Sequence, residues 1–143
     1  MQSGVAAAVD APTGAAINDS SGSAGLTINS SAQFGYGGGS VNAGVDQDIS
    51  SGDTIMFAGG TSATITIKGY GVTTGGDTPT SHAWTITASG WTLGNHPGTT
   101  QNYTNGTISG VTSGTNRIYL DYTASNSGGS SAATQLSFNI RFV

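Results

Sequence analysis

The chain has 143 residues and a net charge of −4, and only 7% of its residues are charged, against about 25% in ordinary globular proteins. Its three basic residues, Lys68, Arg117 and Arg141, are too few to form a nucleic-acid footprint. It also has no apolar run of about 18 residues, the length that would span a membrane. We therefore expect neither a nucleic-acid partner nor a membrane span.

The remaining composition favours β-structure. The strong helix formers Glu, Lys, Leu and Gln are scarce, whereas Thr, Ile, Val and aromatic residues recur in alternating runs. The chain has no cysteine, and Gly, Ser, Thr, Ala and Asn dominate it. Such a composition is typical of secreted surface proteins and phage virion parts. We expect an all-β protein located outside the cell or on its surface.

The first segment, residues 1–24, differs from the rest because it carries small apolar residues and a linker-like Ser20-Ser21-Gly22-Ser23. It is predicted to be a flexible or extended N-terminal arm, followed by a β-sandwich domain over residues 25–143. An arm that cannot pack alone gains stability from a groove on a neighbouring copy. The residues predicted to fill such a groove are Val5, Val9 and Ile17, or alternatively Leu26 and Ile28.

From Gly25 onward, strand signals recur about every 8 to 12 residues, which is typical of a sandwich or barrel. We expect about ten short strands in one antiparallel β-sandwich, Ig-like or jelly-roll-like. Predicted loops cover 72–81, 94–106 and 126–131. The predicted strands cover 26–28, 32–36, 41–45, the residues on either side of a turn at 50–53, 63–70, 83–88, 91–93, 107–111, 116–124 and 133–143.

The last predicted strand has the clearest pattern. Leu136, Phe138, Ile140 and Phe142 alternate with polar residues, and a period of two indicates a strand buried on one face. These four residues are predicted to belong to the groove or terminal strand used in assembly.

Aromatic residues are the candidates for ligand binding. Trp91, Tyr103, Tyr119 and Tyr122 could stack on sugar rings. The alternative is that they are core residues, as we expect for Trp84, because sandwich cores commonly bury a Trp.

Acid–base and metal chemistry have little support. No Cys or Gly-x-Ser-x-Gly motif is present, and the two histidines, His82 and His96, are predicted to be solvated near loops. Asp46, Asp48 and Asp53 are weak calcium candidates, because their spacing begins like an EF-hand loop and then loses its glycine and final Glu. We expect no enzyme activity, no cofactor and no resident metal.

Four Asn residues stand in N-glycosylation sequons, namely Asn18, Asn29, Asn102 and Asn105. In a chain so rich in Asn, Ser and Thr, chance alone produces several sequons. They are candidate glycosylation sites only where the source organism glycosylates exported proteins.

Two segments resemble known families. The arm of small apolar residues (4–17, or 26–36) together with the terminal strand resembles the donor-strand pilins and related fibre-forming β-sandwich subunits, which implies assembly by strand exchange. The segment Ala83-Trp84-Thr85-Ile86-Thr87-Ala88-Ser89-Gly90-Trp91-Thr92-Leu93 resembles the Trp-x-Leu segment of Gram-positive cell-wall-binding domains. The second Trp-x-Leu motif of those domains is missing.

The leading hypothesis is a structural subunit of an extracellular filament or surface assembly, a homopolymer formed by β-strand exchange. One alternative is a carbohydrate- or cell-wall-binding module whose partner is a glycan. The other is a phage virion decoration or fibre protein.

Overall fold

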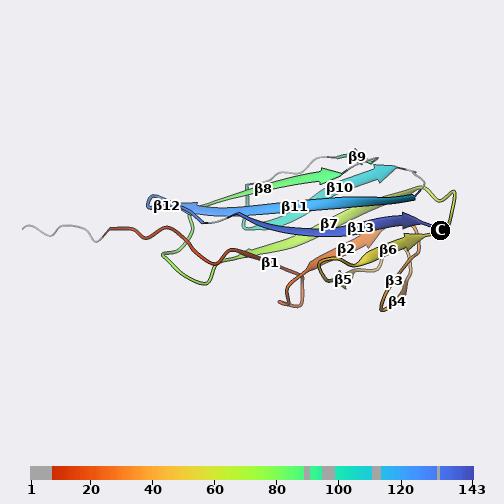
Figure 1. The fold of residues 1–143 in the computed structure, drawn as a ribbon, viewed down its shortest axis with the longest axis horizontal. Helices are drawn as coiled ribbons and strands as arrows, with labels where there is room; N and C mark the ends of the chain where they lie inside the picture. Colours follow the sequence, from red (N-terminus) through yellow and green to blue (C-terminus); the bar gives the residue numbers. More distant parts are fainter. Residues whose placement is uncertain (1–7, 89–90, 95–98, 111–113, 132) are drawn as a thin grey trace, which may run out of the picture.

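The computed structural model describes residues 8–88, 91–94, 99–110, 114–131 and 133–143. The described residues form 13 β-strands and no helix, which confirms the predicted all-β class. Accordingly, none of the described segments provides a helix of the length and hydropathy that crossing a membrane requires. The strands form two sheets (Figure 1).

The first sheet has the order β5-β2-β7-β10-β9, and β1 also pairs with β7. All of its pairs are antiparallel, and the long central strand β7 contacts β1, β2 and β10. Its strands are β1 (Ala16–Asn18), β2 (Leu26–Ser30), β5 (Gln47–Ile49), β7 (Ala63–Val72), β9 (Thr92–Leu93) and β10 (Asn102–Gly110).

The second sheet has the order β12-β11-β13-β6-β3-β4, and β8 pairs with β11. Its strands are β3 (Phe34–Tyr36), β4 (Gly39–Val41), β6 (Thr54–Phe57), β8 (Ser81–Ala88), β11 (Gly114–Asn126), β12 (Gly129–Ser130) and β13 (Thr134–Phe142).

One pair departs from the predicted antiparallel arrangement. The terminal strand β13 runs parallel to β6, in the register Ile140 to Ile55. Alternation of apolar and polar residues specifies which face of a strand is buried, but it carries no information on strand direction. Most of the chain separates β6 from β13, which leaves ample length for the crossover that a parallel pair requires.

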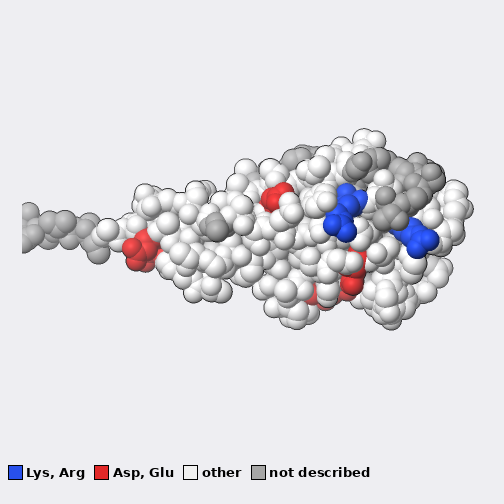
Figure 2. Space-filling view, in the orientation of Figure 1, with Lys and Arg blue, Asp and Glu red and all other residues white. Residues whose placement is uncertain are grey.

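The core lies between the two sheets, because buried side chains of both form one cluster, an arrangement consistent with a β-sandwich. The alternation predicted for the terminal strand is confirmed, since Leu136, Phe138 and Ile140 are buried while Gln135 and Arg141 are exposed. The outer surface is mostly uncharged, and Figure 2 shows isolated acidic and basic groups on a face of otherwise neutral residues.

Two of the differences from the predicted elements bear on the candidate sites. Residues 94–106 were predicted to be a loop, but β10 begins at Asn102. The pattern did not indicate this start because a register shift between Tyr103 and Gly106 breaks the alternation there. Residues 16–18, predicted to belong to the arm, form β1 on the edge of β7. The predicted boundary at residue 24 therefore falls in the loop between β1 and β2.

Candidate functional site

The predicted arm residues divide between the core and the surface. Ile17, Leu26 and Ile28 are at most 4% exposed and belong to the core of their own chain. Since these three side chains are already buried, they are not free to fill a groove on another copy. Val9 is 43% exposed, and Val5 lies outside the described residues.

The predicted terminal-strand residues do not line an open groove. β13 pairs with β11 along one side and with β6 along the other, and Leu136, Phe138 and Ile140 point into the core. Phe142 is half-buried, with its ring centroid 5.7 Å from that of Phe57. A strand added from another copy would therefore have to pair elsewhere.

Residues 9–13 are held between the loop 74–77 and the β11–β12 hairpin at 126–129. We call this arrangement the N-terminal clasp. Figure 1 shows this red segment reaching the end of the molecule where β12 lies. The Asp10 amide donates to a carboxylate oxygen of Asp77 at 2.8 Å, and the Asn126 side-chain amide donates to the Asp10 carbonyl at 2.7 Å.

Two glycines make room for the clasped backbone. A Cβ atom at Gly76 would lie 2.0 Å from the carbonyl oxygen of Ala11, and one at Gly128 would lie 2.0 Å from that of Val9. Such distances exclude any side chain at either glycine. The clasp therefore holds residues 9–13 through close backbone contacts, and Pro12 within this segment is buried.

Among the described residues, strand β8 has one side with no paired strand, which we call its open side. Only β11 pairs with it among the described strands, over Ser81 to Ala88 (Figure 1). Its eight residues contain no Lys, Arg, Asp, Glu, Gly or Pro. Thr85 and Thr87 are exposed and alternate with the buried Trp84 and Ile86.

The predicted sugar-binding aromatics are mostly buried. Trp91, Tyr103 and Tyr122 are 7%, 1% and 1% exposed, so a sugar ring cannot stack on them in this fold, and the core alternative holds for these three. Trp84 is also buried, as predicted, with its centroid 4.4 Å from that of Tyr122. Tyr119 alone among the candidates is half-exposed.

The Tyr103 hydroxyl is buried and has no hydrogen-bond partner among the described residues, and burial raises its pKa to about 12. An unsatisfied buried polar group lowers stability by about 1–3 kcal/mol. We expect Tyr103→Phe to raise the free energy of unfolding by about 1 kcal/mol, measured by chemical denaturation. A lower free energy of unfolding for Tyr103→Phe would contradict this expectation.

His82 lies in β8 and not in a solvated loop. Its Nδ1 is hydrogen-bonded to the Tyr122 hydroxyl at 2.7 Å, and the two rings stack with their centroids 5.9 Å apart. Burial lowers the pKa of His82. His96 lies outside the described residues, and the described part of the chain contains no metal-binding group of His, Cys, Asp and Glu.

The calcium candidates are engaged in hydrogen bonds within the chain. Asn29 donates to Asp46 at 2.8 Å, and Lys68 forms an ion pair with Asp46 at 2.9 Å, which together hold the pKa of Asp46 below its ordinary value. Asp48 accepts from the Ser20 hydroxyl and Asp53 from the Ser50 amide, at 2.8 and 2.9 Å. These carboxylates do not converge on one point.

The sequon residues lie on strands of the first sheet. Asn18 is in β1, Asn29 in β2, and Asn102 and Asn105 in β10. The side chain of Asn105 lies outside the description.

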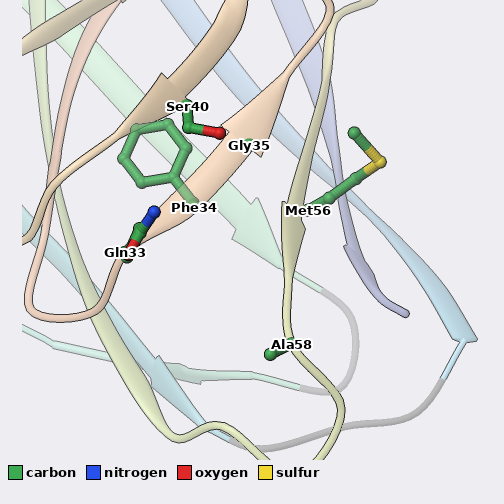
Figure 3. Close-up of a pocket in the computed structure, with 6 residues that line it drawn as sticks. All are labelled: Gln33, Phe34, Gly35, Ser40, Met56 and Ala58. Atoms are coloured by element: carbon green, nitrogen blue, oxygen red, sulfur yellow. The ribbon is translucent and has the colours of Figure 1, made fainter.

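A pocket of about 320 Å³ opens between β3 and β6, because these two strands pair only at Gly35 and Met56. Figure 3 shows its lining on the β3–β4 hairpin and on the facing strand. None of the lining residues is ionisable, so the pocket offers no acid–base chemistry. They are Gln33, Phe34, Gly35, Ser40, Met56 and Ala58.

Comparisons with protein-family models, curated proteins and solved structures gave no significant match.

Proposed function

We propose that the chain is a structural subunit of an extracellular filament or surface assembly, and that copies associate by β-strand addition. In this proposal the domain is one β-sandwich with an N-terminal arm, and the arm comprises residues 1–15. Residues 1–8 of the arm of one copy pair with the open side of β8 on the next copy.

The open side of β8 carries the proposal. Monomeric proteins protect the edges of their sheets with charged residues, prolines, bulges or very short strands. β8 is eight residues long and contains no charged residue or proline, and its register with β11 is regular throughout. An unprotected edge of this kind is a template for another strand.

The N-terminal clasp supports the choice of donor. It anchors residues 9–13 at one end of the molecule through the Asp10 contacts to Asp77 and Asn126. The preceding residues, Gly4-Val5-Ala6-Ala7-Ala8, are small and uncharged. Residues 1–8 span about 28 Å when extended, which is about the length of the eight-residue β8.

The low charge density supports assembly as well. With 7% charged residues and a net charge of −4, copies can pack with little mutual repulsion. Uncharged polar groups on the surface form contacts that depend weakly on salt.

A charged edge tests the proposal directly. We expect Thr85→Lys/Thr87→Lys to abolish assembly, because two ammonium groups on β8 oppose strand addition, while the domain remains folded. The control is Thr64→Lys/Gln135→Lys, which adds the same charge at two exposed positions on the interior strands β7 and β13. Assembly is read by negative-stain electron microscopy and size-exclusion chromatography.

Three results would count against the proposal in different ways. A wild-type protein that stays monomeric near 14 kDa would remove the polymer. Filaments formed equally by the β8 variant and its control would remove β8 as the acceptor. Closed oligomers in place of open filaments would favour the virion decoration protein.

A further inference from the structure

Tyr70 stands between two asparagines on the outer face of the first sheet. In the register of the sheet it is paired with Asn18 on β1 and with Asn102 on β10. A residue pairs with one neighbour on each side, so the three residues form a row across three strands. Adjacent strands lie about 4.8 Å apart, so the row is about 10 Å long.

The row faces solvent. Tyr70 and Asn18 are half-exposed and Asn102 is exposed, whereas their chain neighbours Ile17 and Tyr103 are buried on the inner face. Side chains of paired residues in a sheet point to the same face. The Tyr70 ring and both amide side chains therefore lie together on the outer face.

The polar groups of this row are available to a ligand. No hydrogen bond joins the side chain of Asn18, Tyr70 or Asn102 to another residue within the described segments, although the Asn102 backbone carbonyl accepts from Thr100. Each amide offers two donors and one acceptor oxygen. An aromatic face flanked by amides matches a sugar ring, which is apolar on its faces and carries hydroxyls around its rim.

The backbone beneath Tyr70 is tightly packed. A Cβ atom at Gly71 would lie 2.3 Å from Cζ of Tyr122, and one at Gly69 would lie 3.2 Å from a Leu26 methyl group. Core side chains thus fill the space on the inner face at both neighbours of Tyr70. The backbone of the row is consequently held by a tightly packed central strand.

The charge around the row disfavours an anionic ligand. Lys68, two residues before Tyr70, is the one basic residue on β7, and its ammonium group is paired with Asp46 at 2.9 Å. Asp48 lies on β5, which β2 separates from β7, and it accepts hydrogen bonds from Ser20 and Thr27. With one cation and two carboxylates here, a neutral ligand fits better than a phosphate or an acidic polysaccharide.

We propose that the row Asn18–Tyr70–Asn102 binds a neutral polysaccharide, with the Tyr70 ring stacked on a sugar ring and the two amides bonded to its hydroxyls. This proposal of glycan binding does not depend on the proposed assembly function. Tyr119, a half-exposed aromatic residue of the second sheet, is paired with Thr87 and Ser137. Its row supplies hydroxyls and no amide, so we assign the site to Tyr70.

Affinity electrophoresis through gels containing soluble neutral glucans, xylan or mannans tests the proposal, with alginate and heparin as anionic comparisons. The protein is made in a host without N-glycosylation, because Asn18 and Asn102 stand in sequons. We expect at least one neutral polymer to retard the wild type. Loss of one aromatic contact, about 1.4 kcal/mol, corresponds to about ten-fold weaker binding for Tyr70→Ala, with Tyr70→Trp retaining binding.

Asn18→Ala/Asn102→Ala is expected to weaken binding to a similar extent, and the matched control Tyr119→Ala to leave it unchanged. Thermal melts of each variant separate loss of binding from loss of folding. Retardation by no neutral polymer, retardation by the anionic polymers alone, or a loss caused by Tyr119→Ala and not by Tyr70→Ala would each overturn the assignment. Thr85→Lys/Thr87→Lys should bind as the wild type does, so failure of assembly and failure of glycan binding are distinguishable.

Discussion

Deletion of residues 2–15 is expected to convert the assembled protein into folded monomers. The deletion removes the segment before β1, including the residues held in the clasp, but it keeps Ile17, Leu26 and Ile28 in the core. The buried side chains of both sheets are therefore kept, and folding should persist although the deletion also removes the buried Pro12 and the partly buried Ala15. Size-exclusion chromatography should give a monomer, and circular dichroism should retain the β-sheet signal.

A mixing experiment separates the donor from the acceptor. The deletion variant has an open β8 and no arm, whereas Thr85→Lys/Thr87→Lys has an arm and a blocked β8. Mixed in equal amounts, they can form one junction and no more, so we expect a one-to-one dimer. Filaments from the deletion variant alone would refute the role of the arm, and the absence of any dimer in the mixture would refute pairing of arm and β8.

Trp84→Ala is expected to be the most destabilising single substitution. The Trp84 side chain is 3% exposed and packs on Tyr122 and Tyr103, with centroids 4.4 and 5.5 Å away. Its indole N–H also donates to the Thr100 carbonyl at 2.7 Å. Removing it leaves a cavity and an unpaired carbonyl, and the free energy of unfolding should fall by about 3–5 kcal/mol, measured by urea denaturation.

Trp84→Phe is the matched comparison. It keeps an aromatic ring in the cluster and loses the indole N–H, so its loss of stability should be clearly smaller than that of Trp84→Ala. A loss below about 1 kcal/mol for Trp84→Ala would mean that the site is not packed as described, because truncating a buried Trp to Ala typically costs about 3–5 kcal/mol.

Several elements followed from alternation along the chain. The terminal strand, β7 and the Trp84–Ile86 face of β8 were predicted correctly because each strand is buried on one side, and that environment imposes a period of two on the sequence. The burial of Tyr103 was not evident. The register shift near Tyr103 interrupts the two-residue alternation. The start of β10 therefore has the polar sequence expected of a loop.

The candidate sites depended on pairing between distant segments. The sequence identified an unusual N-terminal segment, but only the structure placed its base between two glycine-containing turns and put Ile17 in the core. The predicted sugar-binding residues were chosen by type alone. In the structure three of them are buried. The aromatic residue that lies beside amide side chains is Tyr70, which is paired with Asn18 and Asn102 from strands far apart in the chain.

The amino-acid sequence by itself determined the all-β class, the low charge and the faces of the long strands, because these depend on composition and on local alternation. The tertiary structure decided strand order, the parallel pair of β6 and β13, the open side of β8 and the row centred on Tyr70. These features arise from register between segments separated by long stretches of chain. Local alternation is compatible with many such registers, and packing of the common core selects among them.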